Sequence, residues 1–122
     1  MNLRTLAIVS GVYDVLLALP LLLAPVAMAR AFGAPEPSPV VNAQLNGVFT
    51  LSLGVGYFWA ARDASLRRGY FWCAGVLAKG LGVVVFLLDS LLRGSPRLFL
   101  LFAGTDGTLA LLTLWLLLRR DS

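Results

Sequence analysis

The sequence predicts an all-α fold, a bundle of four transmembrane helices with both termini in the cytoplasm, and three observations support it. Hydrophobic residues make up 59% of the 122 residues and charged residues only 13%, whereas soluble domains have about 25% charged residues. The apolar residues lie in long runs, and each run is close to the ~20 residues that a membrane-spanning helix needs. Only short loops remain between the runs, so we expect a single membrane domain over residues 1–122.

The first predicted helix covers residues 3–29. Arg4 and the small residues 27–29 imitate the ends of a signal peptide, but the apolar run is longer than the ~7–15 residues usual there. The run also contains Asp14, so we expect a retained helix rather than a cleaved leader. Pro20 removes one backbone hydrogen bond, and we therefore expect a kink or a loosened outer half at this residue.

The second predicted helix covers residues 39–61 and follows a loop with prolines at alternate positions, which oppose helix formation. Ser38 and Pro39 form a typical helix start, with the serine as N-cap and the proline at the first helical position. The helix then begins with three amide side chains: Asn42, Gln44 and Asn46. They indicate either a polar mouth or simply the solvated first turns of a helix, and the sequence leaves both interpretations open.

The third predicted helix covers residues 69–92, and the fourth covers residues 96–118 after a second Ser-Pro start signal at Ser95. Tyr-Phe-Trp triplets end the second helix and open the third, and Trp115 is expected on the same side. Such a grouping is typical of an aromatic belt at one membrane interface. The side that carries both termini has six arginines against three on the other side. The arginine-rich side faces the cytoplasm, so both termini are predicted there.

Several functions are excluded by the residues that the sequence lacks. It contains no histidine and one cysteine, Cys73, which excludes an intramolecular disulfide, histidine proton relays and the usual zinc sites. The formal charge of +4 comes from arginines at the ends of apolar runs, which is a membrane pattern. We therefore expect no cofactor, no metal site, no catalytic residue and no nucleic-acid partner.

Three charged residues interrupt the apolar runs: Asp14, Lys79 and Asp106. At about 1.5 Å per residue, each lies roughly 14–16 Å from the nearest flanking arginine, within a hydrocarbon core ~30 Å thick. The three side chains should therefore meet at one depth. A charge at this depth costs at least ~2.5–3.5 kcal/mol unless it is compensated. We predict that these residues form a buried ionic cluster.

This predicted cluster has one carboxylate more than it has ammonium groups, and the sequence allows three ways to compensate the surplus. One aspartate carries a proton, Tyr13 or Asn46 donates hydrogen bonds, or a cation or cationic ligand binds. Side chains on the predicted inner faces form a possible polar lining: Tyr13, Asn42, Asn46 and Thr50. Small residues flank the charges, and they favour tight helix packing over an open cavity.

The segments Gly11-Val12-Tyr13-Asp14 and Leu19-Pro20, together with short helices rich in glycine, resemble the DoxX-like bacterial membrane proteins. The resemblance covers the whole chain architecturally. It implies a small four-helix protein of the bacterial cytoplasmic (inner) membrane, in a group of which many members have no assigned activity. The chain is also similar in size to the small multidrug antiporters, which place a carboxylate in the first helix but carry no lysine at the midplane.

Three classes of function fit these observations. The favoured class is a structural or accessory bundle, or a bundle that binds a small apolar ligand, in which the charges fix the helix register or hold the interior. The alternative is a proton-coupled small-molecule transporter that acts as an oligomer. A lipid-modifying enzyme ranks last, because a convincing nucleophile is missing. The expected partners are the lipid bilayer, a second copy or a larger membrane complex, and a small apolar or cationic ligand.

Overall fold

The computed structural model describes residues 1–94 and 97–119, which contain helices and no strands. The elements are α1 (Leu3–Leu23), α2 (Pro25–Ala31), α3 (Val40–Ala61), α4 (Arg68–Tyr70), the π-helix η1 (Phe71–Ala78), α5 (Lys79–Arg93), the 3-10 helix η2 (Arg97–Phe99) and α6 (Leu100–Leu118). Because α4, η1 and α5 follow one another without a break, they form one continuous helix.

Three helices among the described residues are long and apolar enough to cross a membrane: Leu3–Leu23, Arg68–Arg93 and Leu100–Leu118. Their lengths of 21, 26 and 19 residues correspond to roughly 28–39 Å, which matches a hydrocarbon core ~30 Å thick. Helix α3 is also long enough, with 22 residues, but the amides in its first turns make it less apolar. The chain thus has the helices that a membrane protein requires.

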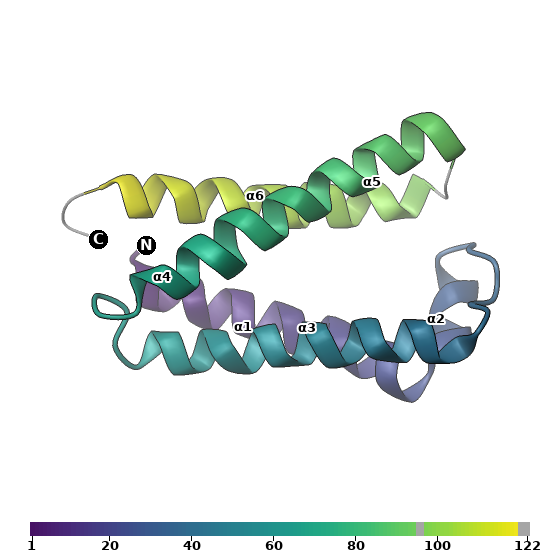
Figure 1. Cartoon of the computed structure of the whole chain (residues 1–122), viewed down its shortest axis with the longest axis horizontal. Helices are drawn as coiled ribbons and strands as arrows, with labels where there is room; N and C mark the ends of the chain where they lie inside the picture. Colours follow the sequence, from purple (N-terminus) through teal and green to yellow (C-terminus); the bar gives the residue numbers. More distant parts are fainter. Residues whose placement is uncertain (95–96, 120–122) are drawn as a thin grey trace.

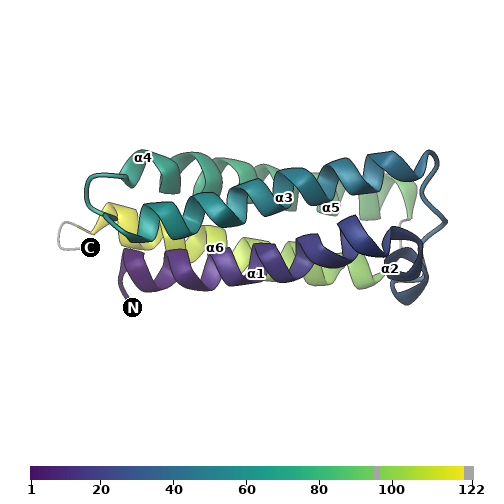
Figure 2. The same ribbon diagram turned by 90° about the horizontal axis from the view of Figure 1, so that it is seen from below.

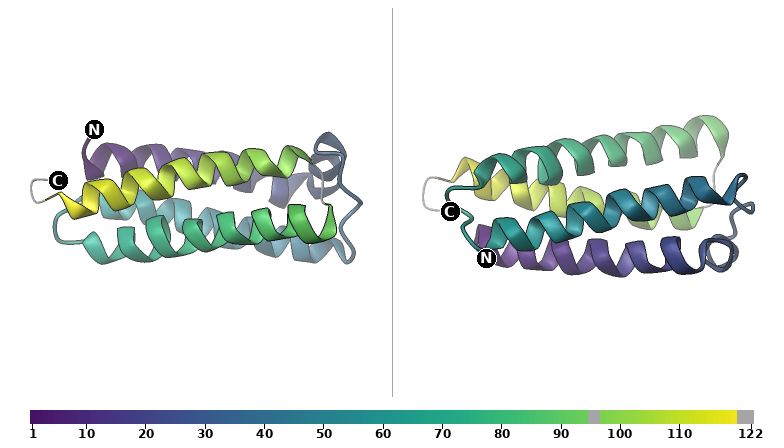
Figure 3. Two further views of the ribbon diagram at one scale, coloured as in Figure 1. Left: turned by 90° about the horizontal axis from the view of Figure 1, so that it is seen from above. Right: turned by 60° about the horizontal axis from the view of Figure 1, so that its bottom comes forward.

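The helices form two antiparallel pairs that lie side by side (Figures 1 and 2). Helix α1 packs along α3, while η1 and α5 pack along α6, and α1 also contacts α6 between the pairs. The start of α1 and the end of α6 lie at the same end of the bundle, here called the terminal end (Figure 1). The opposite end, here called the loop end, carries α2 and the loop of residues 32–39 (Figure 3).

The first apolar run breaks at Ala24, four residues after Pro20, where the sequence predicted a kink or a loosened outer half. Pro20 lies inside α1, whereas Ala24 leaves the helical conformation with φ −146° and ψ 59°. The cause is Pro25, because a proline ring clashes with helical backbone at the residue before it. Pro25 then occupies the first position of α2, where its missing N–H is not needed. The predicted helix over residues 3–29 is therefore two helices.

Helix α3 begins at Val40, and its N-cap is Pro39 rather than the predicted Ser38. Pro39 has an extended backbone, with φ −71° and ψ 153°, which continues the extended, proline-rich loop before it. The second predicted start signal, Ser95-Pro96, lies outside the described residues. The fourth predicted helix ends at Leu118, in agreement with α6.

The aromatic triplets do not all serve as an interfacial belt. Trp59, Trp72 and Trp115 are exposed and lie near the terminal end, as the belt requires. Tyr57, however, is completely buried, so this member of the first triplet was assigned wrongly. A residue two positions before Trp59 lies roughly 200° around the helix axis from it, and Tyr57 therefore faces the interior.

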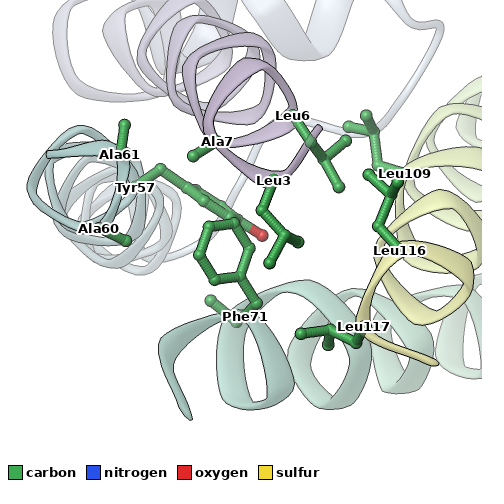
Figure 4. Packing of buried hydrophobic residues seen from close by; sticks show 11 residues of the cluster. Leu3, Leu6, Ala7, Tyr57, Ala60, Ala61, Phe71, Leu109, Leu116 and Leu117 are labelled. Carbon is green, nitrogen blue, oxygen red and sulfur yellow. The ribbon is translucent and has the colours of Figure 1, made fainter. Parts of the chain in front are cut away.

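An apolar core fills the terminal end of the bundle (Figure 4). Its buried members come from all the long helices: Leu3, Leu6, Ala7, Tyr57, Ala60, Ala61, Phe71, Ala74, Leu109, Leu116 and Leu117. Glycines allow the helices to approach closely beside this core. A Cβ atom on Gly54 would lie 3.1 Å from the Gly11 carbonyl oxygen, and one on Gly75 would lie 2.6 Å from Thr113 Cγ2. The helices are therefore packed tightly at the terminal end, as the small residues predicted.

Candidate functional site: an ionic cluster beside an apolar cavity

Asp14, Lys79 and Asp106 come together from three helices, which confirms the predicted ionic cluster. Lys79 Nζ lies 3.0 Å from Asp14 Oδ1 and 3.9 Å from Asp106 Oδ1. The side chains of Lys79 and Asp14 are 8% and 4% exposed, whereas that of Asp106 is 17% exposed. Lys79 therefore donates a hydrogen bond to Asp14, and its interaction with Asp106 is a longer ion pair.

Lys79 is the first residue of α5 and directly follows the π-helix η1. Gly75 and Lys79 are buried, and Ala78 lines the small cavity beside Lys79, so small residues flank the lysine on the inner face, as predicted. A π-helix has a wider turn than an α-helix, and it shifts the side chains that follow it around the helix axis. Such segments are frequent at functional sites. Nothing in the sequence indicated this π-helix.

Two tyrosine rings surround the ammonium group. Lys79 Nζ lies 5.3 Å from the ring centroid of Tyr13 and 5.5 Å from that of Tyr57, within the range of cation–π attraction. The Tyr13 hydroxyl lies 2.6 Å from Thr105 Oγ1. Either hydroxyl can be the donor in this pair, and Tyr13 is also a hydrogen-bonding neighbour of Asp106. Tyr13 thus belongs to the cluster, as predicted, and Tyr57 is an additional member that sequence reasoning placed at the interface.

Three buried side-chain oxygens near the cluster have no hydrogen-bond partner within the described structure: Ser10 Oγ, Asp14 Oδ2 and the Tyr57 hydroxyl. Ser10 precedes Asp14 by one helical turn on α1. Tyr57, on α3, interacts electrostatically with both residues. Buried polar atoms of this kind are costly unless they are satisfied. Polar groups therefore continue from the ion pair to the apolar core at the terminal end, of which Tyr57 is a member.

A large cavity of about 620 Å³ lies on the other side of the cluster, toward the loop end. Its walls come from α1, α3, α5 and α6, and α2 with the following loop covers its outer end. Most lining side chains are apolar, and the polar ones are Asn46, Thr50 and Asp106. The two helix pairs are thus joined by a core at the terminal end and line a partly open cavity at the loop end. The prediction that small residues favour packing over a cavity holds only for the terminal end.

A smaller cavity of about 110 Å³ touches all three charged residues. It shares Thr50 and Asp106 with the large cavity, together with two leucines, Leu17 and Leu53. Asp106 therefore stands at the junction of the ionic cluster and the apolar cavity. Asp106, the carboxylate farther from Lys79, is the one that a ligand in the cavity would contact.

The predicted polar lining is correct for two of the three residues on α3. Asn46 and Thr50 line the large cavity, but Asn42 is exposed and is not part of its wall. Residues spaced by four drift around a helix by about 40° per step, so Asn42 lies roughly 80° away from Thr50. Gln44, between the two asparagines, instead donates to the Leu22 carbonyl at 3.3 Å. Of the three amide residues, only Asn46 thus lines the cavity, and the predicted polar mouth is formed only in part.

No protein-family model matches the chain, and neither a curated protein nor a solved structure is similar to it at a significant level. The site must therefore be interpreted from its own chemistry. Within residues 1–94 and 97–119, no three His, Cys, Asp or Glu side chains form a group that could hold a metal ion. The arrangement combines a large apolar volume with one ammonium and two carboxylate groups at its inner end. Such a site can bind a molecule that has both an apolar and a polar part.

Proposed function

We propose that the chain is an integral protein of the bacterial cytoplasmic membrane, with α1, α3, the Arg68–Arg93 helix and α6 as four spans. Support for α3 as the fourth span comes from its 22 residues and its packing along α1 over the same depth. The excess of arginine at the terminal end supports cytoplasmic termini. The DoxX-like resemblance agrees with this location, but the proposal does not depend on it.

This topology predicts opposite accessibility of the two loops that face the two sides of the membrane. In a Cys73→Ala background, Ser38→Cys should react with a membrane-impermeant maleimide in intact spheroplasts. Ser65→Cys should react only after the spheroplasts are lysed. Both serines are exposed and lie in loops at opposite ends of the bundle. Equal labelling of both positions in intact spheroplasts would contradict four spans with cytoplasmic termini.

We further propose that the bundle binds a small apolar or amphiphilic molecule between its two helix pairs. The observation that carries this proposal is the cavity of about 620 Å³, which ends on Asp106. Its volume lies within the roughly 300–1,000 Å³ of typical ligand pockets. Its apolar walls would hold the body of a ligand, while Asn46, Thr50 and Asp106 would orient the polar part. A purely structural ion pair would explain the cluster but would not require an open volume beside it.

The alternative function, proton-coupled transport by an oligomer, is less well supported. Transport requires that the binding site open in turn to each side of the membrane. In this conformation the apolar core around Leu6, Tyr57 and Phe71 fills the bundle between the cluster and the terminal end. A binding or accessory role needs access from one side only, so it is favoured here.

Filling the cavity should abolish binding without unfolding the protein. A Cβ atom on Gly82 would meet no atom within 4 Å, and Gly82 lines the cavity. The leucine in Gly82→Leu would therefore occupy the space of the ligand without a clash. We expect 4-phenyl-1-butanol, a neutral probe, to raise the unfolding temperature of the wild type in a non-ionic detergent. In Gly82→Leu, the concentration for half the effect should rise at least about tenfold, equivalent to 1.4 kcal/mol.

Gly104→Leu provides the matched control. A Cβ atom on Gly104 also meets nothing within 4 Å, but Gly104 does not line the cavity. This variant should respond to the alcohol like the wild type. If Gly82→Leu and Gly104→Leu respond equally, the probe does not bind in the cavity and the proposed function is wrong.

A further inference from the structure

The charges of the cluster leave the apolar cavity with an excess of negative charge at its inner end. One ammonium group faces two carboxylates, and it hydrogen-bonds the carboxylate of Asp14 at 3.0 Å. Its distance to Asp106 Oδ1 is 3.9 Å, which is too long for a hydrogen bond. The Tyr13 hydroxyl is a hydrogen-bonding neighbour of Asp106, but it is neutral and brings no positive charge. Asp106 thus carries the less compensated charge, and it lines the cavity.

Four phenylalanines form an aromatic wall in the same cavity: Phe32, Phe86, Phe99 and Phe102. Phe102 is at the centre of this wall, with its ring centroid 5.0 Å from that of Phe32 and 5.7 Å from that of Phe86. It precedes Asp106 by one turn of α6, about 6 Å along the helix axis. Aromatic rings pack favourably against an apolar or aromatic group, so the wall suits the body of a ligand whose polar group reaches Asp106.

The cavity is unsuitable for Mg²⁺ or Ca²⁺. Mg²⁺ and Ca²⁺ need six or more oxygen ligands, or several retained waters. The polar groups that line this cavity are few and the walls are apolar. A volume of about 620 Å³ instead matches an organic molecule of drug size.

We propose that the cavity selects a lipophilic organic cation, with an ammonium group at Asp106 and an apolar or aromatic body against the phenylalanine wall. This inference rests on the proposed function and specifies the class of its ligand. The ammonium group supplies the charge that the cluster lacks and can donate a hydrogen bond to Asp106. An anionic head would meet two carboxylates, although it could approach Lys79, and a neutral head would leave the excess charge uncompensated.

Three probes with the same body and different heads test the charge preference: 4-phenylbutylamine, 4-phenyl-1-butanol and 4-phenylbutyrate. Each is titrated against the wild-type protein in a non-ionic detergent at neutral pH, with the unfolding temperature as readout. We expect half-maximal stabilisation by the amine at a concentration at least about tenfold below that of the alcohol, since the ammonium forms a charge-assisted hydrogen bond with Asp106 and the neutral hydroxyl does not bring a charge. The carboxylate should be the weakest ligand.

Asp106→Asn should abolish the preference for the amine over the alcohol, so that the two probes reach half-maximal stabilisation at similar concentrations. Asp89→Asn is the matched control, because Asp89 pairs with Arg93 on α5 at 3.1 Å and does not line the cavity. That variant should keep the preference. If Asp106→Asn fails to fold, the order of the three probes on the wild type still decides.

The outcomes separate this inference from the proposed function. Equal stabilisation by all three probes, sensitive to Gly82→Leu, would leave the binding function intact and overturn the cation preference. A carboxylate that binds best would also overturn it, because Lys79 would then determine the selectivity. If none of the three probes raised the unfolding temperature of the wild type, both the cation preference and the proposed binding function would be wrong.

Discussion

Lys79→Met is expected to lower the free energy of unfolding by about 3–5 kcal/mol, the range for breaking a buried ion pair by removing one partner. Methionine has a similar volume but no charge, so it leaves Asp14 and Asp106 without their ammonium group. Asp14 is almost fully buried, with a side chain 4% exposed, and its ionised carboxylate would have no solvent to compensate it. The measurement is equilibrium unfolding of the purified protein in mixed micelles with increasing denaturing detergent.

The partner substitutions show which carboxylate depends on Lys79. Adding Asp14→Asn to Lys79→Met should recover much of the lost stability, because the most buried charge is then removed as well. Adding Asp106→Asn should recover less, since its ion pair is longer, at 3.9 Å, and more exposed.

Arg93→Met is the control for removing a cation from the same helix. Arg93 pairs with Asp89, but its side chain is 78% exposed, and exposed ion pairs contribute about 0–1 kcal/mol. Equal losses in Lys79→Met and Arg93→Met would show that the buried cluster does not stabilise the fold. Recovery by Asp106→Asn alone would contradict the assignment of Asp14 as the principal partner.

Gly75→Leu is expected to cost about 3 kcal/mol, at the upper end of the range for overpacking. A Cβ atom at this position would lie 2.6 Å from Thr113 Cγ2, and Thr113 is completely buried, so it has no space to move into. The substitution would separate η1 from α6 one helical turn before Lys79, and it should therefore also weaken the Lys79–Asp106 interaction. The same detergent-unfolding assay measures the loss.

Gly80→Leu is the matched control, five residues further along the same continuous helix. A Cβ atom on Gly80 meets no atom within 4 Å, so its replacement should change stability by no more than about 0.5 kcal/mol. If the two leucine variants were equally stable, the close contact between η1 and α6 would not exist in the membrane protein.

The presence and depth of the charged residues could be predicted from the sequence, because both depend on position along the chain. The long apolar runs identify helices that can cross a bilayer, and the rise of about 1.5 Å per residue converts sequence distance into depth. This is why Asp14, Lys79 and Asp106 could be placed at one level before any packing was known. The same arithmetic placed the three tryptophans at one end.

The break at Ala24 was not predicted, because the first run contains two prolines five positions apart. A proline inside a helix costs stability but can be tolerated when neighbouring helices pack against it. The residue before a proline, by contrast, is pushed away from helical dihedrals, and Ala24 responds in this way. The choice between Pro20 and Pro25 depends on packing, which the residue order does not contain.

The rotation of each helix about its axis and the separation of the two helix pairs could not be predicted from the sequence, because both depend on tertiary packing. Tyr57 was assigned to an interfacial belt by its neighbours, although its side chain is completely buried, because a triplet of aromatics spans more than half a helical turn. The sequence left a cavity open as one alternative, but its size and position could not be predicted, since it forms between the two helix pairs and no single helix defines it. The apolar runs and the depth of the charges thus follow from the sequence. Only the packing of the helices determines that Lys79 lies nearer Asp14, which leaves Asp106 to face an apolar cavity.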